Sequence, residues 1–169
     1  YQSVNLLKAA QGHVDIYLPD FKYADRTLAR KLSKCPDYPD VALAALSEMY
    51  SQKGSLDTFD TGGSLAKKGV LVRHLILPGH VQNSVNALTT LFVEFGAELP
   101  LSLMSQYVPV LPHELADLNR PLTAEEFSQV YSHAMDLGFR HLFVQFPVQE
   151  CPETKPPFLP AFRLDKPFA

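Results

Sequence analysis

The stretch GVLVRHLILPG, residues 69–79, is an almost continuously apolar run of β-forming residues that ends in Pro-Gly. A strand with one face in water alternates apolar and polar residues, whereas a strand covered on both faces does not. Strands covered on both faces are typical of parallel sheets flanked by helices. This stretch therefore predicts a buried strand of a parallel sheet, with Arg73 as a charged exception in its body.

Further β-type runs alternate with helical patterns on both sides of this strand. The predicted strands are 14–19, 69–79, 99–110 and 141–146, and the predicted helices are near 25–33, 40–53, 83–94 and 123–138. Strand and helix in alternation indicate βα units and an α/β fold with about four parallel strands. Four strands are too few to close an eight-stranded barrel, so two architectures stay open: a small open sheet, or the C-terminal part of a partial TIM-like (β/α) barrel with its helices outside.

Capping residues predict where the helices begin. Asp40 follows a proline and is expected to cap the second helix, and Asn83 or Ser84 is expected to cap the third. Thr123 and Glu126 have the spacing of a capping box, which predicts the start of the fourth helix.

Composition limits the classes of function. The chain has 169 residues, of which 46% are hydrophobic and 20% charged, which suits one globular domain. A net charge of -3 offers no basic field for nucleic acid, and no apolar stretch is long enough to suggest a membrane span. Cys35 and Cys151 form neither a disulfide framework nor a metal-ligand pattern, which predicts free thiols in a reducing cytoplasm.

The run VDIYLPDFKY, residues 14–23, places charges at the end of a predicted strand. Asp20 and Lys22 are two residues apart and therefore share one face of it. Ligands bind at the C-terminal ends of strands in parallel βα folds, and Arg73 lies in the next predicted strand. The pattern fits either a structural ion pair or a site for a small zwitterionic or carboxylate ligand. His74 alternates to the face opposite Arg73 and is expected to pack against a helix.

The second and third predicted strands end in segments that could add neutral donors to this rim. The residues are Pro78, Gly79, His80, Gln82 and Asn83 after the second strand, and Ser105, Gln106 and Tyr107 after the third.

Three motifs carry a family resemblance. DIYLPDFKY, VRHLILPGHVQNS and LMSQYVP, in this order and spacing, resemble the radical S-adenosylmethionine (radical SAM) proteins, in particular the branch similar to the pyruvate formate-lyase-activating enzyme. The resemblance spans roughly residues 13–146. It implies a partial parallel (β/α) barrel that binds S-adenosylmethionine beside a [4Fe-4S] cluster. It also implies reductive cleavage of S-adenosylmethionine to a 5′-deoxyadenosyl radical, which abstracts hydrogen from a protein glycine or another substrate. The implied partners are a glycyl-radical-type protein and an electron donor such as flavodoxin or ferredoxin.

The resemblance also assigns roles to residues of this chain. Lys22 matches the lysine of the family's Asp-x-Lys and is expected to meet the methionyl carboxylate, with Asp20 orienting it or touching the ribose. Arg73 matches the arginine of a Val-Arg motif and is expected to contact the same ligand. Activating enzymes have Pro-Tyr-His where this chain has Ser105-Gln106-Tyr107. Gln106 and Tyr107 are therefore expected cofactor contacts in a branch distinct from true pyruvate formate-lyase activators.

One family motif is missing. The chain has no Cys-x3-Cys-x2-Cys, so the resemblance places the cluster ligands upstream of Tyr1 and makes this chain a C-terminal portion that is inactive alone. Residues 1–146 would belong to the barrel, and 147–169 would be a proline-rich irregular tail. Two other functions stay open: a non-catalytic α/β binding module for a small acidic ligand, and a metal-independent hydrolase or isomerase with Asp20 as base.

Overall fold

The computed structural model describes residues 2–57 and 65–147. Cys151 and nearly all of the predicted tail, 147–169, lie outside the described residues. The parallel α/β fold predicted from the alternation of strands and helices is confirmed for the described part.

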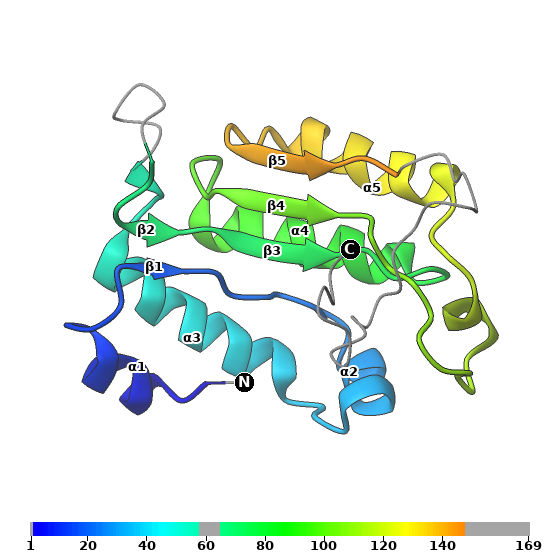
Figure 1. Ribbon diagram of the computed structural model, residues 1–169, viewed down its shortest axis with the longest axis horizontal. Helices are drawn as coiled ribbons and strands as arrows, with labels where there is room; N and C mark the ends of the chain where they lie inside the picture. Colours follow the sequence, from blue (N-terminus) through cyan, green and yellow to red (C-terminus); the bar gives the residue numbers. More distant parts are fainter. Residues whose placement is uncertain (1, 58–64, 148–169) are drawn as a thin grey trace, which may run out of the picture.

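The strands form two small parallel sheets (Figure 1). In the first, β1 (Ile16–Tyr17) pairs with β2 (Gly69–Val70), and in the second, β3 (Val72–Leu75), β4 (Leu101–Met104) and β5 (Leu142–Gln145) lie in the order β3-β4-β5. Because β2 and β3 are nearly continuous, and a parallel bridge joins Asp20 to Arg73, the two sheets share one direction and meet along residues 69–75.

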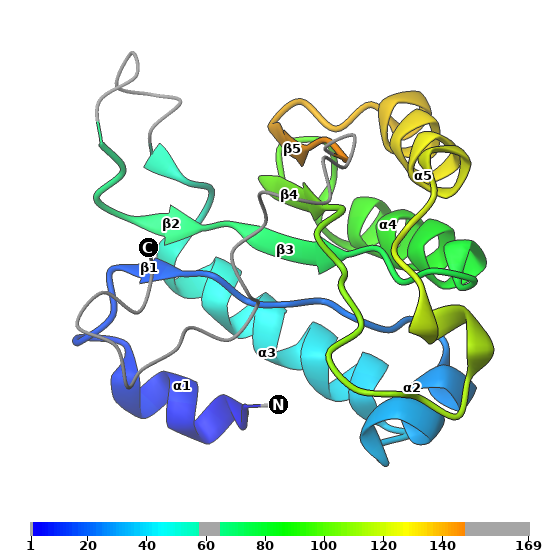
Figure 2. The ribbon, with the colours of Figure 1, turned by 45° about the vertical axis from the view of Figure 1, so that its right-hand side comes forward.

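Helices connect successive strands, as βα units require. They are α1 (Val4–Ala10), α2 (Arg26–Ser33), α3 (Tyr38–Lys53), α4 (Val81–Phe95), the 3-10 helix η2 (Ala116–Asn119) and α5 (Ala124–Leu137). Helices α2 and α3 link β1 to β2, α4 links β3 to β4, and α5 precedes β5. Turning the molecule shows α4 and α5 side by side, on one side of β3 and β4 (Figure 2).

The core fills the space between the sheet and these helices. Val72 pairs with Leu101, and both are fully buried together with Leu88 of α4 and Val130 of α5. Burying such a side chain contributes about 1.5–3 kcal/mol, so this layer supplies much of the folding free energy.

The opposite face of the sheet is only partly covered within the described residues. Arg73 and Leu75 on β3, and Ser102 and Met104 on β4, are half-buried. The interpretation of 69–79 as a strand covered on both faces holds for 69–70 and 76–78, which are buried. It does not hold for Leu71, Arg73 and Leu75, which are half-buried on the face opposite the contact of His74 with α4.

Two predicted helix starts are displaced. Helix α3 begins at Tyr38, with Pro39 in its first turn, where a missing N–H costs nothing. Asp40 is therefore not the cap; its carboxylate forms an ion pair with Arg26 at 2.6 Å. Helix α4 begins at Val81, so neither Asn83 nor Ser84 is its cap.

The predicted start of α5 agrees with the structure, whereas the predicted ends of the strands do not. The capping box of Thr123 and Glu126 is confirmed at the start of α5. The strands are shorter than the apolar runs that predicted them, and β4 begins only after Pro100, which has no N–H to donate to a ladder.

Candidate functional site

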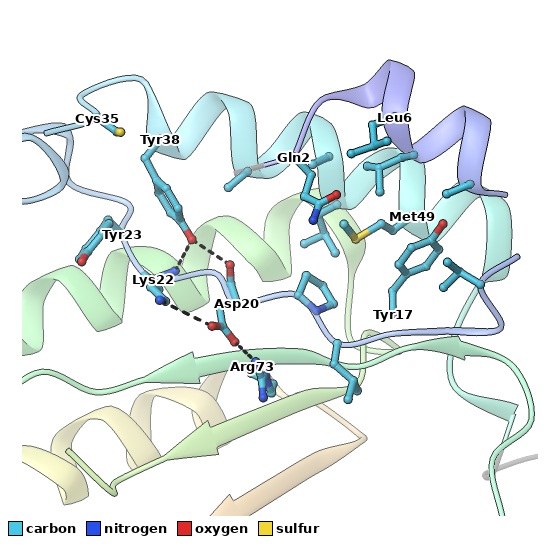
Figure 3. A pocket seen from close by; sticks show the side chains of 18 of the residues that line it. Gln2, Leu6, Tyr17, Asp20, Lys22, Tyr23, Cys35, Tyr38, Met49 and Arg73 are labelled. Atoms are coloured by element: carbon cyan, nitrogen blue, oxygen red, sulfur yellow. Dashed lines mark hydrogen bonds and ion pairs between the residues drawn. The ribbon is translucent and has the colours of Figure 1, made fainter. Parts of the chain in front are cut away.

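The three charged residues predicted from strand periodicity lie together at one rim. Arg73 Nη2 is 2.7 Å from Asp20 Oδ1, and Lys22 Nζ is 3.7 Å from Asp20 Oδ2 (Figure 3). Their side chains are 41%, 31% and 50% exposed for Arg73, Asp20 and Lys22. Ion pairs at such exposure contribute about 0–1 kcal/mol to stability. One carboxylate between two cations leaves an excess of one positive charge facing the solvent.

The backbone explains why these side chains meet. Arg73 N donates to Pro19 O at 2.8 Å, and Phe21 N donates to Arg73 O at 2.9 Å, so Asp20 is paired with Arg73 across a parallel bridge. Paired residues on neighbouring strands point to the same face of a sheet. Lys22 follows two residues after Asp20 and returns to that face.

Two buried polar atoms at this rim have no hydrogen-bond partner in the described part of the chain. They are Asp20 Oδ1, whose contact with Arg73 is an ion pair without hydrogen-bond geometry, and Arg73 Nε. Buried polar atoms in folded proteins are nearly always paired, with protein groups or with bound molecules. An acceptor and a donor side by side are suited to a ligand that offers both kinds of group.

The charged rim opens onto a pocket of about 640 Å³. Figure 3 shows the charges at one end and an apolar wall running away from them along α1 and α3. The wall includes Leu6, Val14, Tyr17, Leu46 and Met49. A pocket of this size with an apolar wall and a few polar groups at one end is typical of small-molecule sites.

Tyr38 is a site residue that the sequence did not reveal. Its hydroxyl donates to the Asp20 carbonyl at 2.8 Å and accepts from the Lys22 N–H at 3.0 Å. Burial raises the pKa of Tyr38 to about 12, so the hydroxyl keeps its proton at neutral pH and can make both bonds.

Asn83 is structural rather than a donor at the rim. Its Oδ1 accepts from Ala24 N and Asp25 N, and its Nδ2 donates to Lys22 O. The side chain thus holds the backbone that leads from the rim into α2.

His74 holds the same segment from the core side, which confirms that it packs against a helix. It is fully buried, with Nδ1 at 2.6 Å from Phe21 O and Nε2 at 2.9 Å from Ser84 Oγ on α4. A carbonyl can only accept, so Nδ1 carries the proton and Nε2 accepts from the Ser84 hydroxyl. Burial lowers the pKa of His74 and keeps the ring neutral.

Gln106 and Tyr107 are not brought to the pocket. The Tyr107 hydroxyl donates to Leu118 O at 2.8 Å, and Gln106 Nε2 lies 3.8 Å from Met104 Sδ. The Gly79 N–H, from the other predicted rim segment, donates to Glu126 Oε1 at 2.7 Å.

The residues present fit one of the two expected cofactor groups. Lys22 and Arg73 offer cationic donors for a carboxylate, as S-adenosylmethionine requires. In residues 2–57 and 65–147 no group of three His, Cys, Asp or Glu side chains could hold a metal ion, and Cys35 at the pocket edge is a free thiol. The family resemblance expects the cluster ligands upstream of Tyr1, and the [4Fe-4S] cluster stays a prediction.

Comparison with known proteins identifies no family. No family model matches the chain, and neither does any solved structure. An uncharacterized protein of Methanocaldococcus jannaschii is 27% identical over 130 residues, which cover 76% of this chain and 34% of that protein. The chain thus spans about a third of the length of this curated relative. None of the helices in the described ranges combines the length and the apolar composition that a membrane span requires.

Proposed function

We propose that this chain is the C-terminal part of a radical S-adenosylmethionine enzyme similar to the pyruvate formate-lyase-activating enzyme. The observation that carries the proposal is the convergence of Asp20, Lys22 and Arg73 at the mouth of a pocket. In the proposed enzyme, S-adenosylmethionine bound at an upstream [4Fe-4S] cluster supplies a 5′-deoxyadenosyl radical that abstracts hydrogen from a protein glycine or another substrate, with an electron from a donor such as flavodoxin or ferredoxin.

Charge complementarity supports this ligand. The excess positive charge of the rim suits the methionyl carboxylate, which must lose part of its hydration when it enters the pocket. Lys22 is the most exposed of the three side chains and can swing its ammonium group to this carboxylate. Asp20 holds Arg73 in place at 2.7 Å.

The arrangement of the strands supports a place in a larger parallel barrel. Among the described residues no strand lies beside β1 on the side away from β2, and the Arg73 face of the sheet is half-buried. Further strands added at β1 would extend the sheet, and barrel closure would enclose that face. The greater length of the Methanocaldococcus jannaschii relative is compatible with such an addition.

The proposal is tested by replacing Lys22 in the full-length protein. Lys22→Ala is expected to weaken S-adenosylmethionine binding by about 1.5–3 kcal/mol, the range for losing a hydrogen bond to a charged group, or roughly 10- to 150-fold in dissociation constant. Lys31→Ala is the matched control, because it removes one lysine charge from an exposed position of α2. Wild-type affinity in Lys22→Ala would give the Asp20–Lys22 pair a structural role only.

A non-catalytic α/β binding module for a small acidic ligand is the second candidate. It is favoured by the same charged rim, which suits many carboxylates. Anaerobic iron and sulfide reconstitution separates the two candidates. A radical S-adenosylmethionine enzyme in full length should become brown and absorb near ~400 nm, as thiolate-ligated clusters do, whereas a binding module should stay colourless.

A further inference from the structure

Residues 20–22 continue the path of β1 for a short distance beyond its ladder with β2. On their inner side the backbone pairs with Arg73, through Arg73 N to Pro19 O and Phe21 N to Arg73 O. Phe21 points into the core and is 1% exposed, so Asp20 and Lys22 on either side of it point to the pocket.

On their outer side the same residues are paired with a side chain and not with a strand. The Tyr38 hydroxyl donates to Asp20 O and accepts from Lys22 N, at 2.8 and 3.0 Å. In a parallel ladder, a residue of the neighbouring strand likewise donates to one carbonyl and accepts from the N–H two residues further on. One hydroxyl group thus makes both bonds that a neighbouring strand would make here.

Tyr38 is held firmly enough to take the place of a neighbouring strand. It is 8% exposed, begins α3, and its ring packs edge-on against Tyr23 at a centroid distance of 5.2 Å. The hydroxyl is therefore presented by a buried ring at the start of α3, and the same ring also packs against Phe21 at a centroid distance of 6.4 Å.

We propose that Tyr38 is a positioning residue whose hydroxyl takes the place of a neighbouring strand beside residues 20–22 and holds Asp20 and Lys22 at the pocket rim. A strand added at the outer edge of β1 then ends before Asp20, because the Asp20 carbonyl and the Lys22 N–H are already bonded. The rim charges stay uncovered, although the sheet can extend beside residues 16–19. The effect on ligand affinity rests on the proposed function; the effect on the backbone does not.

The test compares Tyr38→Phe with Thr89→Val in the full-length protein. Tyr38→Phe removes one hydroxyl that makes two hydrogen bonds and keeps the ring. Thr89→Val also removes one hydroxyl that makes two hydrogen bonds, to Val85 O and His133 Nε2, at a position that does not line the pocket. A thermal melt of both variants establishes that each is folded. Amide hydrogen exchange at Lys22 and the dissociation constant of S-adenosylmethionine are then measured.

In Tyr38→Phe we expect the Lys22 amide to exchange about tenfold faster than in Thr89→Val, and the S-adenosylmethionine dissociation constant to rise about tenfold, which corresponds to the loss of roughly one hydrogen bond. Unchanged exchange at Lys22 overturns the proposal, and so does faster exchange with unchanged affinity. If the wild-type protein does not bind S-adenosylmethionine, the proposed function fails. The exchange rates alone then decide the positioning role: faster exchange supports it and unchanged exchange overturns it.

Discussion

Asp20 and Arg73 are joined twice, once through their backbones and once through their side chains. The backbone hydrogen bonds on either side of Asp20 are 2.8 and 2.9 Å long, and the carboxylate lies 2.7 Å from the guanidinium. The position of the Asp20 backbone therefore does not depend on the ion pair, and its carboxylate serves to orient Arg73 and Lys22 at the rim.

Removing the charge of Asp20 should cost little stability. Asp20→Asn keeps the shape of the side chain and the backbone bridge, and the ion pairs that it loses are partly exposed. We expect the free energy of unfolding to fall by no more than about 1 kcal/mol, measured by urea denaturation. A loss well above about 2 kcal/mol would indicate that these charges serve the fold and not a site.

Glu126 should make the fold sensitive to acid. Its carboxylate accepts from both Nη atoms of Arg120 at 2.8 Å, from Gly79 N and from Thr123 N. The Arg120 hydrogen bonds are the largest cause that lowers the pKa of Glu126 from 4.5 to about 2. A depressed carboxyl pKa stabilises the fold above the unfolded pKa, and this contribution is lost as the pH falls from about 4.5 to about 2.

The variant Glu126→Gln tests this assignment. It should lower the free energy of unfolding at pH 7 by about 1.5–3 kcal/mol, because hydrogen bonds to a charged group are lost. The difference between wild type and variant should shrink as the pH falls through the same window. Glu125→Gln, one residue earlier and exposed, is the control. A difference that is constant from pH 7 to pH 2 would contradict the role of the charge.

His74 should add a second pH dependence at higher pH. Because burial lowers its pKa in the folded protein, the unfolded chain binds the proton more tightly. The contribution of His74 is thus complete above the unfolded pKa of about 6.5 and declines as the pH falls below it. Urea denaturation of wild type and His74→Gln between pH 8 and pH 5 should show a steeper loss for wild type. The exposed His13→Gln serves as control, and an equal slope in all three proteins would refute the expectation.

Gly69 should tolerate no side chain. Its φ is +134°, and a Cβ atom there would lie 2.4 Å from Leu56 Cα, a backbone atom that cannot rotate away. Gly69→Ala is expected to lower the free energy of unfolding by more than about 2 kcal/mol, since backbone strain and a clash add. Gly96, with φ of +78° and open space around it, is the matched control, and Gly96→Ala should cost about 1–2 kcal/mol. Equal losses of unfolding free energy in the two variants would show that small shifts of the backbone relieve the clash at Gly69.

Features that depend on the spacing of apolar and polar residues a few positions apart could be predicted from the sequence. The apolar run 69–79 and its alternation with helical patterns gave the parallel α/β fold, because such patterns depend on local periodicity. The meeting of Asp20, Lys22 and Arg73 followed from two rules: residues two apart share a face, and neighbouring parallel strands end at the same edge. The side of the sheet that each helix covers has no such local signal, so the partly covered Arg73 face was not foreseen.

Residues whose role depends on tertiary contacts could not be predicted. Tyr38 looks like an apolar residue near a helix start, and its bonds go to backbone atoms that any sequence would provide at positions 20 and 22. Asparagine often caps helices, which makes Asn83, like Ser84, a candidate cap in the sequence, whereas its amide in the structure bonds the backbone of Lys22, Ala24 and Asp25.

The carboxylate of the ligand provides the most direct test of the proposed site. Isothermal titration of the full-length protein would compare S-adenosylmethionine with decarboxylated S-adenosylmethionine, which lacks only that group. If Lys22 and Arg73 bind the carboxylate, the wild-type protein should prefer S-adenosylmethionine by at least about tenfold, and Lys22→Ala should lose most of this preference. Equal affinity of the wild-type protein for the two compounds would contradict the account.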